Sequence, residues 1–165
     1  MNAEQLHTPC YVIDRDRLEE NLKVLRGVMD RTGCRILLAQ KAFSCYAVYP
    51  LISQYLCGAT ASGLFEARLC HEEMPGRENH IFSPAFREED MPEILSICDH
   101  IVFNSIRQLE LFGARAKEAG LQVGLRINPQ ISTQPPEHAI YDPCAKGSRL
   151  GVTLDEFRDG MGQNP

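Results

Sequence analysis

A regular alternation of short apolar segments and helical patterns most constrains the fold of this chain. The apolar segments begin about 21 residues apart, which is the span of one strand, one helix and two short loops. They are RILLAQ from Arg35, CGATAS from Cys57, HIFSP from His80, HIVFNS from His100 and QVGLRINP from Gln122. The spacing predicts five consecutive βα units.

Helical patterns fill the intervals and carry their own start and stop signals. They cover residues 46–56, 64–73, 88–98 and 106–119, and an earlier helix runs from about Asp16 to Gly33. Ser105-x-x-Gln108 and Thr153-x-x-Glu156 are capping boxes, so a last helix is expected after Thr153. Gly33 and Gly120 are expected helix stops.

Alternating strands and helices predict an α/β protein with a parallel sheet. Two architectures are compatible with this pattern. One is a five-stranded doubly wound sheet of the flavodoxin type, with the role of a binding module. The other is a partial (β/α)8 TIM-type barrel, because a full barrel needs eight units and typically about 250 residues. We expect residues 1–34 to form an N-terminal segment with the first helix, and residues 35–165 to form five βα units.

Composition narrows the possible partners and location. There are 17 basic and 22 acidic residues, a net charge of −5, and no basic block, which argues against nucleic-acid binding. No apolar run is long enough to cross a membrane, and MNAEQLHTPC does not have the pattern of a secretory signal. Seven dispersed cysteines without a CxxC pair indicate reduced thiols, so we expect a cytoplasmic protein. The five histidines are too dispersed to predict a metal site.

Lys41 is the first candidate for chemistry, since it ends the apolar segment RILLAQ and precedes Ala42 and Phe43. A lysine at a strand end is most often a solvated surface residue. In a parallel α/β protein, however, the carboxyl ends of the strands are where ligands bind. An amine desolvated there loses its proton more easily, and the neutral amine attacks aldehydes. Both interpretations stay open from the residues alone.

An ordered set of motifs resembles one enzyme family. TPCYVIDRDRLEENL, ILLAQKAFS, CGATASGLFEA, GLRINPQ and YDPCAKGSRLGV occur in that order. Together they resemble the amino-terminal half of the carboxynorspermidine decarboxylases. These are pyridoxal-phosphate (PLP) enzymes with an alanine-racemase-like barrel, related to the diaminopimelate and ornithine decarboxylases.

The resemblance implies roles for individual residues. Lys41 matches the lysine that forms the Schiff base with pyridoxal 5'-phosphate, and Arg126 matches an arginine that reaches the cofactor from the fifth strand. Thr60 falls about where ornithine decarboxylases carry an aspartate, which leaves the role of the second strand open. Ser62 is expected to be a helix N-cap and Glu66 a first-turn acid, both structural.

The long segment 128–151 contains four prolines and no sustained period, and loops of this length are usually functional or disordered. It would follow the fifth strand at the carboxyl edge of the sheet. Tyr141, Asp142 and Cys144 lie in it. They either line a pocket or pack the loop, and the sequence does not distinguish these roles.

The resemblance implies decarboxylation of carboxynorspermidine or carboxyspermidine to norspermidine or spermidine, by a homodimer when the enzyme is full-length. In that family the later barrel strands and a carboxyl-terminal β-domain complete the active site. We therefore expect this chain to have weak or no activity alone. A diaminopimelate- or ornithine-type decarboxylase, or a racemase, of the same fold is the near alternative.

Overall fold

The computed structural model describes residues 6–133, 135 and 142–163. In chain order its elements are α1 (Arg15–Thr32), β1 (Leu37–Ala39), η2 (Tyr46–Val48), α2 (Tyr49–Ile52), β2 (Gly58–Ala61), α3 (Leu64–Glu73), β3 (Glu78–Phe82), η3 (Glu88–Asp90), α4 (Met91–Ile97), β4 (His100–Phe103), α5 (Ile106–Glu118), β5 (Gln122–Leu125) and α6 (Leu154–Gln163). Every predicted strand and helix is present. No helix in the described part of the chain is long and apolar enough to cross a membrane.

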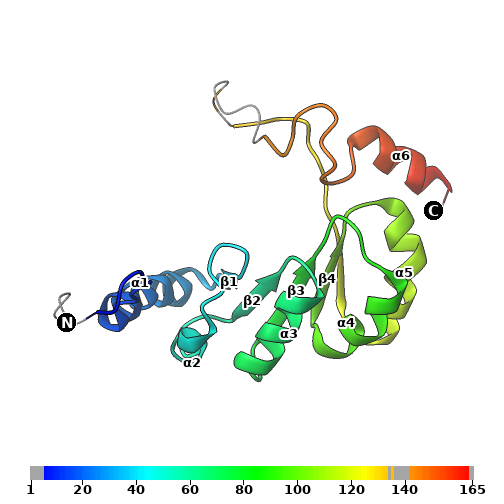
Figure 1. The fold of residues 1–165 in the computed structure, drawn as a ribbon. Coiled ribbons are helices and arrows are strands. Elements are labelled where there is room, and N and C mark those ends of the chain that lie inside the picture. Colours follow the sequence, from blue (N-terminus) through cyan, green and yellow to red (C-terminus); the bar gives the residue numbers. More distant parts are fainter. Residues whose placement is uncertain (1–5, 134, 136–141, 164–165) are drawn as a thin grey trace.

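The five strands form one parallel sheet in the order β1-β2-β3-β4-β5. In a doubly wound sheet the strand order reverses at a switch point, and the flavodoxin order is 2-1-3-4-5. The flavodoxin-like alternative is therefore wrong. Crossovers that share one hand and step in one direction place their helices on the same face of the sheet. Figure 1 shows α3, α4 and α5 along one side of the strands, as in part of a barrel.

The helix ends follow the signals in the sequence. The Asp14 side chain caps α1 by accepting hydrogen bonds from the amides of Asp16 and Arg17, and Gly33 ends this helix with a φ of 71°. The Ser105 hydroxyl accepts a hydrogen bond from the Gln108 amide at the start of α5. The expected last helix is α6, and the Thr153 amide donates to Glu156 Oε2 over 2.8 Å at its start.

Side chains alternate between the two faces of the sheet, and this separates the core from the candidate site. Along β3, Asn79 and Ile81 are buried against the helices, whereas Glu78, His80 and Phe82 are partly exposed on the opposite, inner face.

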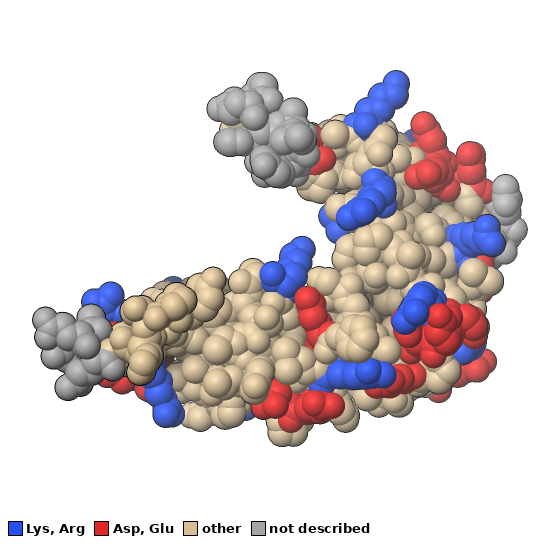
Figure 2. Space-filling view, viewed as in Figure 1, with Lys and Arg blue, Asp and Glu red and all other residues tan. Residues whose placement is uncertain are grey.

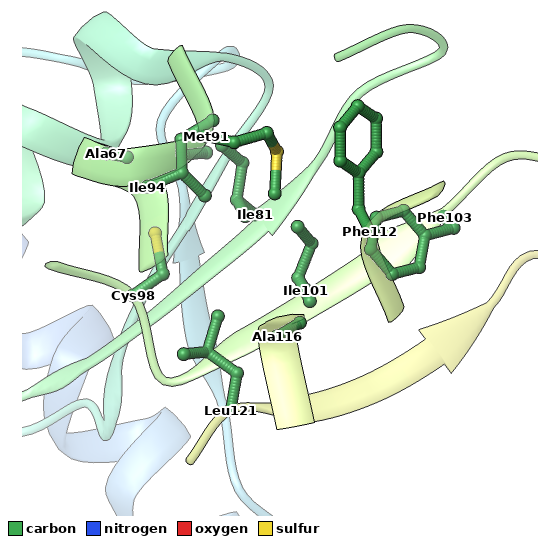
Figure 3. Packing of buried hydrophobic residues seen from close by; sticks show 11 residues of the cluster. Ala67, Ile81, Met91, Ile94, Cys98, Ile101, Phe103, Phe112, Ala116 and Leu121 are labelled. Atoms are coloured by element: carbon green, nitrogen blue, oxygen red, sulfur yellow. The ribbon is translucent and has the colours of Figure 1, made fainter. Parts of the chain in front are cut away.

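The hydrophobic core on the helix side of the sheet has two clusters. One lies between the sheet and α3–α5 and is drawn in Figure 3; its buried residues are Ala61, Ala67, Ile81, Met91, Ile94, Cys98, Ile101, Phe103, Phe112, Ala116 and Leu121. The other joins α1, α2 and α3 to β2 and contains Leu22, Tyr49, Leu51, Ile52, Leu56, Ala59, Cys70 and Met74.

Beyond β5 the chain returns to the same edge of the sheet. Val152 pairs with Ile127 in a parallel bridge, and the Val152 amide donates to Arg126 O over 2.8 Å. Asn104 holds this return in place, because its Oδ1 accepts from the Gly151 amide and its Nδ2 donates to Arg149 O, each over 2.8 Å. A sixth strand-like pairing thus follows the five predicted units.

Candidate active site

Lys41 lies where the sequence predicts it, two residues after the end of β1 at the carboxyl edge of the sheet. The preceding Gln40 is buried on the helix side, whereas the Lys41 side chain is exposed. Lys41 lines a small cavity of about 100 Å³ together with Thr60, Ala61, Ser62 and Phe82. Three neighbouring strand ends therefore meet around this amine.

Lys41 is exposed, so the described residues around it do not desolvate its amine. Figure 2 shows that the molecule is deeply hollowed on one side, and that Lys or Arg side chains project into the hollow from both walls. The loop after β1 borders this hollow on one side, and the segment after β5 borders it on the other. The rim position and the exposure together leave the Lys41 side chain accessible to a ligand.

Arg126 continues the line of β5 and is fixed through its backbone. Its amide donates to Phe103 O over 2.9 Å, and its carbonyl accepts from Val152. The guanidinium carbon lies 4.7 Å from the centre of the Phe82 ring, a cation–π contact. Phe82 also lines the Lys41 cavity, so one aromatic ring connects the two residues that the sequence singles out.

Phe82 was not among the predicted site residues. The available signal was an aromatic residue at the end of the third predicted strand, HIFSP, one strand away from the segment that ends in Lys41. Phe82 could have been predicted as a binding residue only if the order of the strands in the sheet had been known. Thr60, whose role was open, borders the same cavity.

The expectation that Ser62 is an N-cap is wrong. The N-cap of α3 is Gly63, in an extended conformation and without a side-chain cap, because the helix begins one residue later than expected. Glu66 is a first-turn acid as predicted, and its Oε2 accepts a hydrogen bond from the Ser62 amide over 2.6 Å. The carboxylate of Glu66 therefore satisfies the backbone next to the cavity.

The long loop contributes less to the site than the strand ends do. Tyr141 lies outside the described residues. Asp142 Oδ1 accepts a hydrogen bond from the Cys144 amide over 2.8 Å, and neither residue lines the Lys41 cavity. Loop packing is the role that this contact favours for Asp142.

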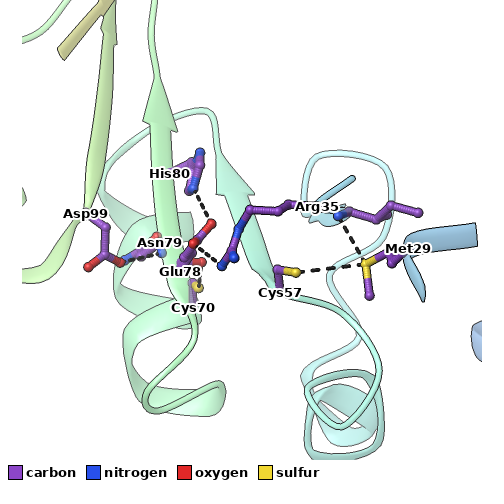
Figure 4. A network of polar contacts seen from close by, with 9 residues as sticks. Met29, Arg35, Cys57, Cys70, Glu78, Asn79, His80 and Asp99 are labelled. Carbon is purple, nitrogen blue, oxygen red and sulfur yellow. Dashed lines mark hydrogen bonds and ion pairs between the residues drawn. The ribbon is translucent and has the colours of Figure 1, made fainter. Parts of the chain in front are cut away.

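A second polar group lies on the inner face, toward the opposite end of the strands. Glu78 binds Arg35 through Oε1 and His80 Nε2 through Oε2, the latter over 3.0 Å (Figure 4). The ring of His80 stacks on that of His100 from β4, with centroids 3.8 Å apart and planes 14° apart. Ligand atoms of Glu78, His80 and His100 lie within 4.8 Å of one another, a grouping that the dispersed histidines of the sequence did not predict.

The protonation of this group follows from its surroundings. Burial lowers the pKa of His80, although its hydrogen bond with Glu78 opposes the effect. Burial would raise the pKa of Glu78, but the hydrogen bonds from His80 and Arg35 hold it below its usual value. Nearly parallel rings direct their nitrogen lone pairs side by side rather than at one point, so the arrangement suits ring stacking better than metal ligation.

Comparison with known proteins agrees with this geometry. No family model matches the sequence. The carboxynorspermidine/carboxyspermidine decarboxylase of Campylobacter jejuni is 38% identical over 159 residues, covering 96% of this chain and 40% of that enzyme. The carboxyaminopropylagmatine decarboxylase of Synechocystis sp. is 38% identical over 147 residues, covering 89% of this chain and 37% of that enzyme.

A solved structure extends the likeness to three dimensions. The crystal structure of carboxynorspermidine decarboxylase from Campylobacter jejuni, complexed with norspermidine, superposes with a TM-score of 0.80 at 34% identity. The match covers 93% of this chain and 38% of that one. The chain thus spans about 40% of the length of the relatives that it matches. The predicted resemblance to the carboxynorspermidine decarboxylases, with their alanine-racemase-like barrel, is therefore confirmed in sequence and in fold for the part of those enzymes that this chain spans.

Proposed function

We propose that this chain is part of a PLP-dependent carboxy-lyase of polyamine biosynthesis, which acts on carboxynorspermidine or carboxyspermidine. The observation that carries the proposal is the position of Lys41 at the carboxyl end of β1, in a cavity whose wall includes Phe82 beneath Arg126. Two relatives named carboxynorspermidine/carboxyspermidine decarboxylase support it. So does the relative whose crystal structure contains norspermidine.

The residues around the cavity suit an anionic, aromatic aldehyde such as pyridoxal phosphate. Lys41 offers a primary amine, Phe82 a flat apolar face, and Arg126 a cation beside that face. Thr60 and Ser62 add hydroxyl groups at the cavity wall. When bound, the cofactor would supply a conjugated ring that accepts the electron pair released as carboxylate leaves as CO2.

The chain's own residues would hold and orient the reacting groups. Lys41 Nζ provides the point of attachment, and the edge of the sheet fixes its place relative to the second and third strands. Arg126 brings positive charge to the same edge, and the Phe82 ring restricts the directions in which its guanidinium points. A homodimer of the full-length enzyme and a cytoplasmic location stay predictions from the resemblance.

Covalent trapping tests the proposal. The chain is incubated with pyridoxal phosphate, reduced with borohydride and mapped by mass spectrometry, which distinguishes its four lysines, Lys23, Lys41, Lys117 and Lys146. Exposed Lys117 on α5 is the internal control, and Lys41→Arg keeps the charge at position 41 while removing the amine. We expect label to concentrate on Lys41 and to vanish there in the variant. Equal labelling of Lys41 and Lys117 would refute the proposal.

Substrate assays separate the proposed reaction from the near alternative. CO2 release is compared for carboxynorspermidine, carboxyspermidine, carboxyaminopropylagmatine, diaminopimelate and ornithine with the full-length enzyme. We expect a preference for the first three, and a preference for diaminopimelate or ornithine would favour the alternative. Because the chain spans only part of its relatives, we expect little or no CO2 release from the chain alone.

A further inference from the structure

One buried hydroxyl contacts both arms of the turn that carries Lys41. Tyr49, the first residue of α2, is 0% exposed. Its hydroxyl lies 3.3 Å from Gln40 Oε1 and 3.4 Å from Phe43 O. Gln40 precedes Lys41 by one residue and Phe43 follows it by two. Both distances are longer than those of an ordinary O–H···O hydrogen bond, so each contact is weak.

The backbone around Lys41 forms a tight turn between these contacts. The Gln40 amide donates to Thr60 O over 3.2 Å and extends the β1–β2 pairing by one residue. The amides of Ala42 and Phe43 then both donate to Ala39 O, over 3.0 and 3.2 Å. The side chain of Gln40 is thus held on the helix side, and Lys41 faces the cavity on the other side.

Packing alone does not account for this polar pair. Gln40 is 1% exposed, and its Nε2 finds no hydrogen-bond partner among the described residues. A buried donor without an acceptor lowers stability, and an apolar side chain of similar shape would avoid that loss. Burial also raises the pKa of Tyr49 to about 12, so its hydroxyl stays a neutral donor at ordinary pH. The pair therefore has an energetic cost, which a role in positioning the turn would explain.

We propose that Tyr49 is a positioning residue for Lys41, joining the Gln40 side chain to the Phe43 carbonyl so that the Lys41 amine faces the cavity beside Thr60 and Phe82. This inference rests on the proposed function, in which Lys41 is the residue that binds the aldehyde. Tyr49 itself does not line that cavity.

Two matched tyrosine variants test the proposal. Tyr49→Phe removes only the hydroxyl and keeps the ring in the core. Tyr55→Phe removes a hydroxyl that bonds to Glu19 Oε1 over 2.7 Å, away from the Lys41 turn, and is the control. The readout is the ratio of borohydride-trapped label on Lys41 to that on Lys117. We expect Tyr49→Phe to lower this ratio by about twofold, the lower end of the range for one hydrogen bond, and Tyr55→Phe to leave it unchanged.

A second readout needs no cofactor. Hydrogen exchange at the amides of Ala42 and Phe43 is expected to be faster in Tyr49→Phe than in the wild type or in Tyr55→Phe. If wild-type Lys41 is labelled no more than Lys117, the proposed function fails, and exchange still tests the positioning role. If Lys41 is labelled preferentially and both readouts are the same in Tyr49→Phe as in the wild type, the positioning role is overturned.

A double variant separates positioning from stability. Gln40→Met with Tyr49→Phe leaves no polar group of the pair buried, so its urea midpoint is expected to return toward the wild-type value. Its Lys41 labelling ratio is expected to stay low, because the link to the Phe43 carbonyl is still absent. Recovery of the ratio together with the midpoint would show that Tyr49 acts on stability alone and would refute the proposal. If Tyr49→Phe does not fold, the same measurements are made on the double variant instead.

Discussion

Replacement of Gly58 by alanine should separate β2 from β3. Gly58 is buried opposite Glu78 in the sheet. A Cβ atom on Gly58 would lie 1.9 Å from Glu78 O and 2.6 Å from its carbonyl carbon, whereas real Cβ contacts are not shorter than 3.0 Å. Because the obstructing atoms are backbone, the strand itself must move by about an ångström, which strains the 3.0 Å hydrogen bond from the Glu78 amide to Cys57 O.

The expected cost combines two effects. Overpacking costs about 1–3 kcal/mol, and a weakened backbone hydrogen bond adds about 1 kcal/mol. The free energy of unfolding should therefore fall by about 2–4 kcal/mol, a large part of the 5–15 kcal/mol typical of a domain. Urea unfolding followed by circular dichroism measures the change as a lower midpoint.

Gly27→Ala is the matched control for this substitution. Gly27 lies within α1, and its Cβ would meet only Arg31 Nη1, at an ordinary 3.7 Å. The same chemical change should here raise the free energy of unfolding by about 0.5–1 kcal/mol, because alanine favours the helix. A Gly58→Ala chain that unfolds at or above the wild-type midpoint would refute the reasoning.

Two further predictions concern protonation. The lowered pKa of His80 means that the unfolded chain binds this proton more readily than the folded chain, so stability should decrease as the pH falls from 7 to about 5. His80→Gln should flatten this decrease in urea midpoints measured at each pH, and identical slopes would contradict the assignment. Burial raises the pKa of Cys98 to about 12, so iodoacetamide should modify it far more slowly than exposed Cys34 in the folded chain. Peptide mass spectrometry measures both rates, and comparable rates would mean that Cys98 is not protected by the fold.

Local signals were sufficient to predict the elements of this fold. Apolar segments, capping residues and glycine stops act over a few residues, and the strands and helices that they predict are all present. The placement of Lys41 at a strand end follows from the same short-range pattern. The error at Ser62 is also local, because a shift of one residue in the start of α3 moves the cap to Gly63.

Contacts between strands could not be predicted in the same way. His80 and His100 are 20 residues apart in sequence, and they stack only because β3 and β4 pair in the register that places them opposite each other. The contact of Phe82 with Arg126 depends likewise on the order and curvature of the sheet. The exposure of Lys41 depends on which surfaces surround it, and no periodicity in its own segment encodes them.

The consecutive strand order has a consequence for how this sheet is assembled. Each strand binds the one that precedes it in the chain, so every pairing closes a loop of similar, short length. The entropy lost per step is then nearly constant, and no distant segment has to arrive before the next unit docks. A chain of this kind can add its units one after another as they leave the ribosome, each new strand using the edge of the last as its template.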